Sequence, residues 1–184
     1  GGTAYLAAAD ESGMCVSLIQ SNYRGFGSGI TVPDWGINLH NRGCFFSLDP
    51  EHANVVAPSK RPMHTLMPAM ALREGRPSHV FGTMGGDGQP QIHVQLLARM
   101  IDDACDLQPA VDAPRWILDL GDWSVVVEDR FDPEVVAGLR ALGHEVKVTS
   151  AFDDLMGHAH VLGIGPDRIV GAVDPRSEGA VVGF

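Results

Sequence analysis

Residues 3–21 read TAYLAAADESGMCVSLIQS, two apolar runs on either side of a turn signal. The runs at 4–9 and 14–20 suit half-buried strands, and the DESG between them is typical of a hairpin turn. We therefore expect the fold to begin with an antiparallel β-hairpin. Pairing about this turn brings Ser21, which follows the second run, back beside Thr3.

Seven more strands are expected beyond this hairpin. They lie at 36–39, 66–72, 78–83, 124–128, 145–149, 160–164 and 169–173. The pair at 66–72 and 78–83 flanks a turn containing Gly75 and predicts a second hairpin. The stretch at 41–61 is irregular and longer than an ordinary connection, so it is either a functional loop or a flexible linker.

Two helices are predicted. The first, at 89–103, carries apolar residues at helical spacing: Ile92, Leu96, Leu97, Met100 and Ile101. The second begins after the N-cap Asp132 and ends at Gly143, with one apolar side: Val135, Val136, Leu139 and Leu142. Paired strands with few helices predict an α/β fold with antiparallel sheet, in one domain over 1–184.

Composition narrows the class of protein. The chain has 184 residues, 45% of them hydrophobic, which is enough for a sizeable core, and no stretch reaches the roughly 20 apolar residues of a membrane span. We therefore expect a soluble protein. The 13 basic and 23 acidic residues give a net charge of −10, which disfavours nucleic acid and anionic membranes as partners. Small molecules or another chain are the expected partners.

Neither a disulfide framework nor a metal site is indicated. The cysteines, Cys15, Cys44 and Cys105, are odd in number and widely spaced, and we expect them to be buried thiols. His158 and His160 have no third ligand at a suitable spacing, so the alternation of a strand explains the pair better than a metal does. No cofactor is predicted.

Thr3 has two competing interpretations. A β-branched residue favours a strand, so Thr3 can be purely structural. Its hydroxyl can instead act as a nucleophile, if cleavage of the Gly2-Thr3 bond frees the α-amine of Thr3 as the base. The neighbouring Ser21 can support that hydroxyl through a hydrogen bond, or it can simply face solvent.

Gly85 and Gly86 follow an expected strand and precede the first expected helix. Because neither has a β-carbon, two successive N–H groups can turn toward one point, which then attracts negative charge. Such a point is an oxyanion hole, a phosphate loop or an ordinary turn. The phosphate loop is disfavoured because Asp87 follows where Gly-Lys-Ser/Thr is needed.

Polar residues in the middle of the chain are candidates for binding a substrate. Arg42, preceded by Asn41, can hold a carboxylate through two parallel hydrogen bonds. His64 and Thr65 can supply neutral hydrogen bonds. A solvated basic turn is the alternative for these residues. Near the end of the chain, DPRS at 174–177 predicts a turn whose Asp and Arg pair with each other.

Taken in order, these motifs resemble the gamma-glutamyltranspeptidase family. The resemblance rests on Thr3 ahead of the paired strands and on six further motifs: Phe26-Gly27-Ser28-Gly29, Asn41-Arg42, Lys60-Arg61-Pro62, Met84-Gly85-Gly86, Asp112-Ala113-Pro114-Arg115 and Asp174-Pro175-Arg176-Ser177. They span the whole chain and match the small, C-terminal subunit. In that family the nucleophilic threonine attacks the preceding peptide bond and so releases this subunit from a single-chain precursor.

The resemblance implies an N-terminal-nucleophile hydrolase fold, an αββα sandwich completed by a large subunit from the same precursor. It also implies hydrolysis or transfer of the γ-glutamyl group of glutathione or a similar amide. Thr3 is then the nucleophile and its own amine the base. Ser21 is the supporting hydroxyl, and Gly85 and Gly86 are the oxyanion-hole donors.

This chain differs from the glutamyl-specific members at positions that bind the acyl group of the substrate in those members. Tyr23 stands where those members carry an Asn, and His64 and Thr65 replace two serines that hold the substrate's carboxylate. Arg42 and Phe45 lie where a Gln and an acidic pair meet its amine. Since Phe45 cannot counter an ammonium, the departures suggest an acyl group without an amine, such as the glutaryl-like group cut by relatives that resemble cephalosporin acylases.

In the sequence as given, Gly1 and Gly2 precede Thr3 and block its amine, so we expect an inactive or precursor-like polypeptide. Gly2 suits self-cleavage because a residue without a β-carbon leaves its carbonyl open to attack. A non-catalytic half that retains only the fold is the alternative. In either case, apolar surface is expected where the large subunit packs.

Overall fold

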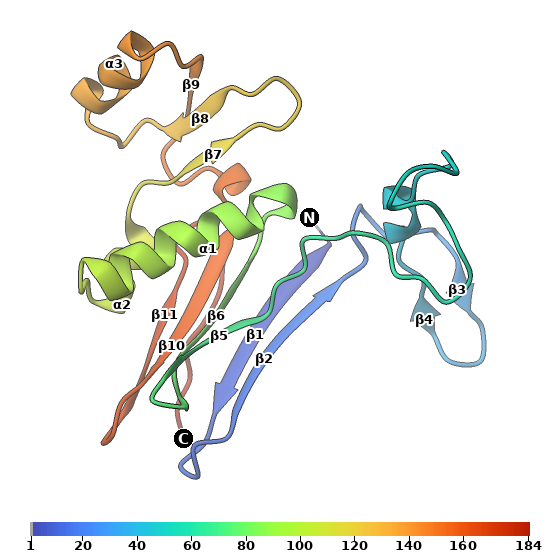
Figure 1. Ribbon diagram of the computed structural model, residues 1–184. Coiled ribbons are helices and arrows are strands. Elements are labelled where there is room, and N and C mark those ends of the chain that lie inside the picture. The colour runs from blue at the N-terminus through green and yellow to red at the C-terminus, as the bar shows by residue number, and fades with distance from the viewer. Residues whose placement is uncertain (1) are drawn as a thin grey trace.

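The chain begins with the predicted hairpin. The structure is a computed structural model that describes residues 2–184, so Gly1 lies outside the described residues. Strands β1 (Thr3–Ala9) and β2 (Cys15–Ser21) pair antiparallel, and Thr3 lies directly opposite Ser21 (Figure 1). The Asp10 carbonyl accepts a hydrogen bond from the Gly13 N–H at 3.1 Å and closes the turn. Both the hairpin and its register are confirmed.

A second, four-stranded sheet is antiparallel throughout, in the order β11-β10-β6-β5. Its strands are β5 (Ala69–Arg73), β6 (Arg76–Met84), β10 (His158–Ile164) and β11 (Ile169–Val173). The predicted second hairpin is β5–β6, although its first strand starts at Ala69 rather than at 66, after Pro68, which has no N–H to donate to a ladder. His158 and His160 are two residues apart on β10 and therefore lie on the same face of the strand, with the buried Ala159 on the other face.

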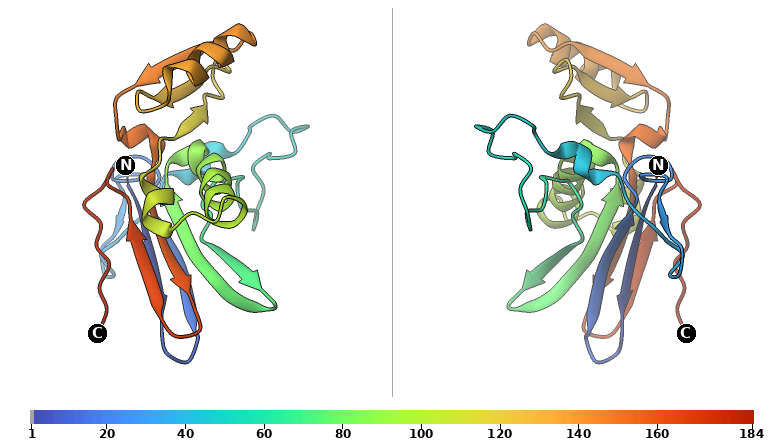
Figure 2. Two further views of the ribbon diagram at one scale, coloured as in Figure 1. Left: turned by 90° about the vertical axis from the view of Figure 1, so that its left-hand side faces the viewer. Right: turned by 90° about the vertical axis from the view of Figure 1, so that its right-hand side faces the viewer.

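The two sheets pack face to face, and Tyr5 of β1 fills the space that a side chain on Gly82 of β6 would need. Burial raises the pKa of Tyr5 to about 12, against an opposing hydrogen bond to Ser17. The other face of the four-stranded sheet is covered by helices α1 (Gln89–Leu97) and α2 (Leu107–Asp112) (Figure 2). These are three of the four layers of an αββα sandwich.

Helix α1 runs into a π-helical turn, η3 (Ala98–Asp102), so the predicted helix at 89–103 is confirmed. The core between helices and sheet includes Ile92, Leu96 and Met100. Ile101 is 46% exposed, and its place in the buried stripe was predicted wrongly, because the π turn shifts the helical periodicity. Helix α2 was not predicted.

A smaller unit of three strands and one helix lies beyond α2. It contains β7 (Trp116–Leu118), β8 (Val125–Glu128), α3 (Pro133–Ala141) and β9 (Val146–Thr149). The side chain of Asp132 accepts a hydrogen bond from the Glu134 N–H at 2.8 Å, which confirms the predicted N-cap. Val135 and Leu142 are exposed, contrary to prediction. Strands β8 and β9 are parallel because α3 forms the crossover between them, which corrects the expectation of purely antiparallel sheet.

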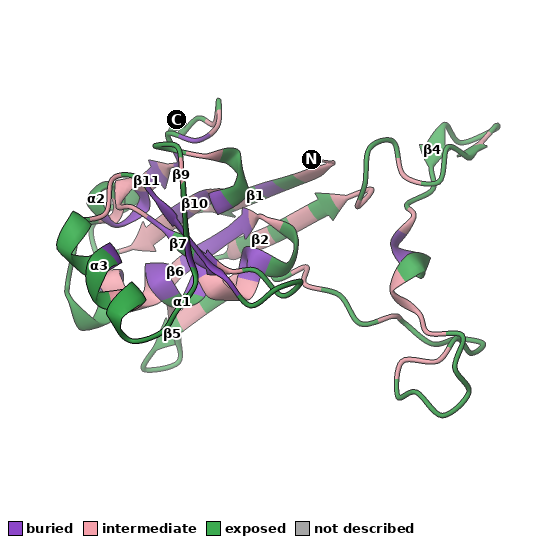
Figure 3. Cartoon of the chain, turned by 90° about the horizontal axis from the view of Figure 1, so that it is seen from above, coloured by how far each residue is buried: buried purple, intermediate pink, exposed green. Residues whose placement is uncertain are grey.

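The segment between β2 and β5 is mostly irregular and extends away from the sheets (Figure 3). Its short elements are β3 (Thr31–Val32), β4 (Ile37–Asn38) and the 3₁₀ helix η1 (Arg42–Phe45). Two further 3₁₀ turns, η2 (Gly86–Gly88) and η4 (Asp154–Met156), lie near the end of β6 and before β10. Cys44 and Cys105 are exposed, so the prediction of buried thiols is wrong for these two.

The outer face of the β1–β2 hairpin carries apolar side chains that nothing in the described chain covers. Leu6, Val16 and Leu18 are 55%, 47% and 45% exposed. Apolar surface was expected where another subunit packs, and this face has that character. Separately, none of the helices in residues 2–184 is both long and apolar enough to cross a membrane.

Candidate active site

Thr3 and Ser21 form the centre of the candidate site. The register of the hairpin places their hydroxyl oxygens, Oγ1 and Oγ, 2.8 Å apart. Ser21 Oγ also accepts hydrogen bonds from the Tyr23 N–H at 3.0 Å and from Arg42 Nη2 at 2.8 Å. A hydroxyl has two acceptor lone pairs and one hydrogen. Because both lone pairs are filled by groups that only donate, the hydrogen of Ser21 points to Thr3 Oγ1.

This arrangement leaves the hydroxyl hydrogen of Thr3 free to go to a base. It also places a hydrogen-bond donor, Ser21, on the oxygen that would become an alkoxide. A donor backed by a guanidinium polarises that oxygen more strongly than a solvated serine does. The alternative that Ser21 merely faces solvent is therefore excluded by its three partners.

The carbonyl ahead of Thr3 is held as well. The Gly2 oxygen accepts a hydrogen bond from the Asn22 N–H at 3.0 Å, the next rung of the same hairpin ladder. A β-carbon on Gly2 would lie 2.9 Å from the Gly25 carbonyl oxygen, closer than real β-carbons approach. Glycine at position 2 therefore lets the chain lie close to the loop that follows β2, while the Gly2 carbonyl is held by the Asn22 N–H.

Gly85 and Gly86 follow directly on β6. Their φ angles are +146° and +53°, a region that favours glycine. Gly86 is the first residue of η2, whose N-terminus has no side-chain cap, so N–H groups there remain available. The end of β6 and the start of β1 lie at the same edge of the two packed sheets (Figure 1). Two glycine amides thus lie at the edge that carries Thr3.

A buried ion network lies behind this glycine pair. Arg115 contacts Asp174 at 2.6 Å, and Arg176 contacts Asp174 at 3.0 Å and Glu128 at 2.6 Å. The predicted pairing of Asp174 with Arg176 is confirmed. Arg115 Nη1 also donates to the Gly157 carbonyl at 3.3 Å, and Gly157 packs against Met84 and Gly85. Burial lowers the pKa of Arg115 to about 10, which still leaves it charged at neutral pH.

Tyr23 links the loop residues of the site. Its φ of +73° is unusual for a residue with a side chain, and its ring packs on Phe45 with ring centroids 4.8 Å apart. The guanidinium carbons of Arg24 and Arg42 lie 5.2 and 5.1 Å from the centre of the same ring. Three of the positions that differ from the glutamyl-specific pattern, Tyr23, Arg42 and Phe45, therefore form one cluster beside Ser21.

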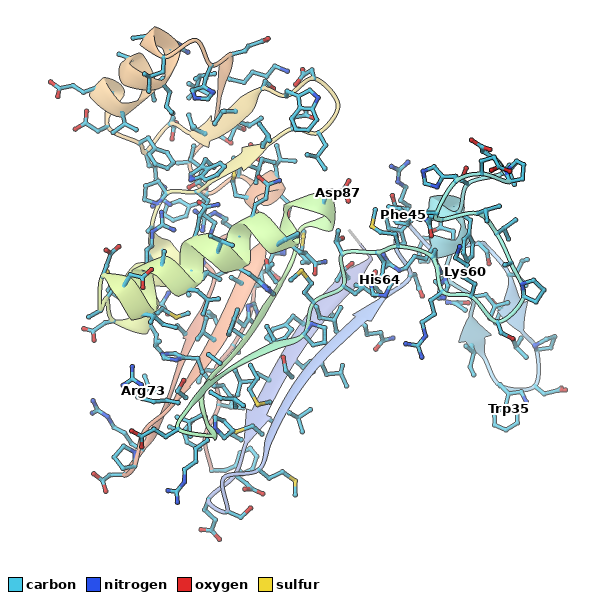
Figure 4. The ribbon with its side chains drawn as sticks, viewed as in Figure 1. Trp35, Phe45, Lys60, His64, Arg73 and Asp87 are labelled. Carbon is cyan, nitrogen blue, oxygen red and sulfur yellow. The ribbon has the colours of Figure 1, made fainter. Side chains whose placement is uncertain are left out.

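The remaining candidates, Asn41, His64 and Thr65, form no hydrogen bond with Thr3 or Ser21 in the described chain. The Asn41 amide donates to the carbonyls of Arg24 and Gly27 and accepts from the Arg24 N–H, so it holds the loop that follows β2. His64 is exposed, and its Nδ1 accepts from the Leu66 N–H at 3.2 Å. Figure 4 shows His64 at the Thr3 end of the hairpin, on the side of Phe45, whereas Thr65 is half-buried beside it in the chain.

Sequence reasoning missed two parts of the site. The Asn22 N–H could have been found by extending the predicted ladder one residue past Thr3 and Ser21. The bond from Arg42 to Ser21 had no such signal, because the irregular loop between them has no periodicity that fixes its path. Among residues 2–184, no cluster of His, Cys, Asp or Glu suited to a metal ion is present.

Comparison with known proteins agrees with this geometry. The family model described as gamma-glutamyltranspeptidase matches residues 1–184. The chain is 47% identical to an oxamate amidohydrolase proenzyme of Klebsiella pneumoniae and 43% identical to the glutathione hydrolase-like YwrD proenzyme of Bacillus subtilis. These matches cover 100% and 99% of the chain and 36% of each relative, so the chain spans about a third of their length.

Solved structures show the same fold. A cephalosporin acylase from Bacillus halodurans, 40% identical, superposes with a TM-score of 0.90 over 98% of this chain and 34% of that one. A gamma-glutamyltranspeptidase from Pseudomonas nitroreducens, 25% identical, gives 0.85 over 98% of both chains. The N-terminal-nucleophile hydrolase fold predicted from the motifs is confirmed. This chain belongs to the gamma-glutamyltranspeptidase family.

Proposed function

We propose that residues 1–184 form the small-subunit domain of an N-terminal-threonine amide hydrolase or acyltransferase. The rest of the precursor supplies a large subunit, which covers the exposed face of the β1–β2 hairpin. The observation that carries the proposal is the 2.8 Å contact between Thr3 Oγ1 and Ser21 Oγ, in which we assign Ser21 as the donor because its oxygen already accepts from the Tyr23 N–H and from Arg42.

Self-cleavage comes first. Thr3 Oγ1 attacks the Gly2 carbonyl carbon, and the Asn22 N–H stabilises the negative charge that develops on the Gly2 oxygen. The C–N bond then breaks, the nitrogen of Thr3 takes up a proton, and water hydrolyses the resulting ester. A free α-amine next to the Thr3 hydroxyl is the product, and this amine is the base for later turnovers.

Turnover repeats the same chemistry on a substrate amide. The α-amine takes the proton of Thr3 Oγ1 as the oxygen attacks the acyl carbonyl, and the N–H groups of Gly85 and Gly86 stabilise the tetrahedral oxyanion. Passing the proton to the leaving nitrogen breaks the C–N bond and leaves an acyl ester on Thr3. Water or an acceptor amine then attacks this ester and restores the hydroxyl.

The acyl group is γ-glutamyl or a related carboxylic acyl group, bound with help from Tyr23, Asn41, Arg42, His64 and Thr65. A relative named for glutathione hydrolysis supports the first, and a relative named for oxamate, whose acyl group carries no amine, supports the second. Phe45 favours the amine-free class, because an aromatic ring packed on Tyr23 offers no carboxylate to an ammonium.

The test is mass spectrometry of the complete precursor after expression. We expect two fragments that separate between Gly2 and Thr3, and release of ammonia or amine from simple amides by the processed enzyme. Thr3→Ala keeps the precursor whole and inactive, whereas Thr3→Ser cleaves more slowly and Thr31→Ala, an exposed strand threonine, behaves as wild type.

A precursor that stays intact yet hydrolyses amides at full rate contradicts the proposal. An intact precursor without any turnover instead identifies the chain as a structural half that retains the fold alone.

A further inference from the structure

Arg42 is a buried cation without a carboxylate partner in the described chain. It is 6% exposed, comparable with Arg115 and Arg176 at 0% and 8%. The latter two contact carboxylates at 2.6 to 3.0 Å, but no Asp or Glu of residues 2–184 lies within salt-bridge distance of Arg42. Buried charges in proteins are normally paired, so this position is prepared for an anion that the described chain does not supply.

Most of the hydrogen-bonding capacity of Arg42 is also unused. A guanidinium has five N–H donors in a planar fork. One Nη2 hydrogen goes to Ser21 Oγ, and Nε and Nη1 have no acceptor among residues 2–184. The Ser21 bond and the ring of Tyr23, 5.1 Å from the guanidinium carbon, fix the plane of the fork in advance. A pre-oriented fork with free donors matches a carboxylate.

The free donors lie close to the nucleophile. Thr3 Oγ1 to Ser21 Oγ and Ser21 Oγ to Arg42 Nη2 are each 2.8 Å, so Oγ1 and Nη2 are at most about 5.6 Å apart. A reacting carbonyl carbon sits about 3–3.5 Å from its nucleophile. An anion bound by Arg42 is therefore part of the acyl group, or lies next to it.

We propose that the free edge of Arg42 binds the carboxylate of the acyl group, and that the preferred substrates are monoamides of short dicarboxylic acids without an amine. This inference rests on the proposed function. A two- or three-carbon acyl group reaches the fork after ordering one or two single bonds. A glutaryl or γ-glutamyl group must order several more, at a cost of about 0.5–1.5 kcal/mol for each flexible group of side-chain size immobilised.

The same cluster disfavours an amine on the substrate. Arg24 and Arg42 flank the ring of Tyr23, and Phe45 packs against it. An ammonium group placed beside Tyr23 is repelled by the two guanidinium groups. The Tyr23 ring, which could attract a cation, already interacts with these two arginines. L-Glutamine, which differs from glutaramate by its α-ammonium group, is therefore the poorer substrate of the two.

The experiment uses the processed enzyme obtained from the complete precursor and measures ammonia release. Oxamate, malonamate and glutaramate are compared with L-glutamine, and oxamate and malonamate each also with its neutral diamide. A hydrogen bond to a charged group contributes about 1.5–3 kcal/mol. We therefore expect kcat/KM to favour each of the two short acids over its diamide by about 10- to 100-fold, to fall from malonamate to glutaramate, and to fall again to L-glutamine.

Variants separate carboxylate binding from support of Ser21. Arg42→Met lowers kcat/KM for the acids by a further 10- to 100-fold relative to the diamides, so that the preference disappears. Ser21→Ala slows acids and diamides, and the acids keep most of their preference because the ring of Tyr23 still orients the fork. Arg73→Met, an exposed arginine at the far end of the sheets in Figure 4, changes neither rate.

Several results would overturn the inference while leaving the proposed function intact. They are equal rates on acids and diamides in the wild type, an Arg42→Met variant that slows both alike, or a preference for L-glutamine over malonamate. The first two would mean that a carboxylate of the large subunit already pairs with Arg42. Failure of the precursor to cleave and to hydrolyse any amide would contradict the proposed function itself, and the inference with it.

Discussion

The buried arginines of this chain lie in two contrasting regions. Arg115 and Arg176, behind the glycine pair, are enclosed by Asp174, Glu128 and backbone carbonyls. Arg42, on the Ser21 hydroxyl beside Thr3, has one hydroxyl as acceptor and no carboxylate in the described chain. In the first region each of the two arginines contacts a carboxylate within the chain, and so it serves the fold. The second has no protein acceptor within residues 2–184 for Nε and Nη1, and its Nη2 lies at most about 5.6 Å from Thr3 Oγ1, so its free edge is open to a ligand or a partner.

The contrast predicts that the same substitution, arginine to methionine, lowers the free energy of unfolding much more in the first region than in the second. Arg115→Met removes one partner from a fully buried pair and leaves Asp174 and the carbonyls of Met156 and Gly157 under-satisfied. Breaking a buried pair in this way typically costs about 3–5 kcal/mol. We expect a loss of that size in the free energy of unfolding, measured by urea denaturation of the full-length protein.

Arg73→Met serves as the control for Arg115→Met, because Arg73 is exposed and forms no ion pair within residues 2–184. A loss below about 1 kcal/mol in Arg115→Met, in the range of surface substitutions, would show that the network does not stabilise the fold and would remove the contrast.

The sequence predicts the parts of the two regions that lie in regularly spaced strands, helices and turns. The register of residues 3–21 follows from two short strands and one turn, and it places Ser21 opposite Thr3 as found. The N-cap Asp132 and the glycine pair after β6 follow from equally local rules. Where the chain follows a period of two or of 3.6, the predicted strands and helices are found, although Ile101, Val135 and Leu142 at the ends of the two helical stripes are exposed.

Positions set by long-range packing were not predictable in this way. Helix α2 has six residues and β7 only three, too few to show a period. The bond between Arg42 and Ser21 crosses a loop without regular structure, and the bond between Arg115 and Asp174 joins residues 59 positions apart in the sequence. The sequence indicated that these arginines belong to motifs, but not which acceptors they reach.

Acid titration tests the difference between the two regions. Of the two, only the region around Arg115 and Arg176 contains buried carboxylates from the described chain, Glu128 and Asp174. Burial by itself raises the pKa of Glu128, but hydrogen bonds from Arg176, the Arg115 N–H and Arg130 outweigh it and hold the pKa below its ordinary value of 4.5. A carboxyl group with a depressed folded-state pKa stabilises the fold above the unfolded value, and this stabilisation is lost as the pH falls through the folded value.

We therefore expect the free energy of unfolding of the full-length protein to decrease below about pH 4.5. Glu128→Gln should be less stable at pH 7 and should show a shallower decrease with acid, because the linked proton is gone. Parallel pH profiles of the variant and the wild type would assign the acid lability to other groups, such as His93, whose pKa is lowered to about 4 by burial.

Arg42→Met is expected to change the free energy of unfolding less than Arg115→Met does, although it should change the rate of amide hydrolysis more. Arg42→Met loses the hydrogen bond to Ser21, but it leaves no buried acid unpaired and removes a desolvated charge. These terms oppose each other, so the free energy of unfolding should change by less than about 1 kcal/mol. Urea denaturation beside Arg115→Met tests this directly. A loss as large as that of Arg115→Met would mean that an acid from the rest of the protein pairs with Arg42. The two regions would then be alike, and the free edge of the guanidinium would be unavailable to substrate.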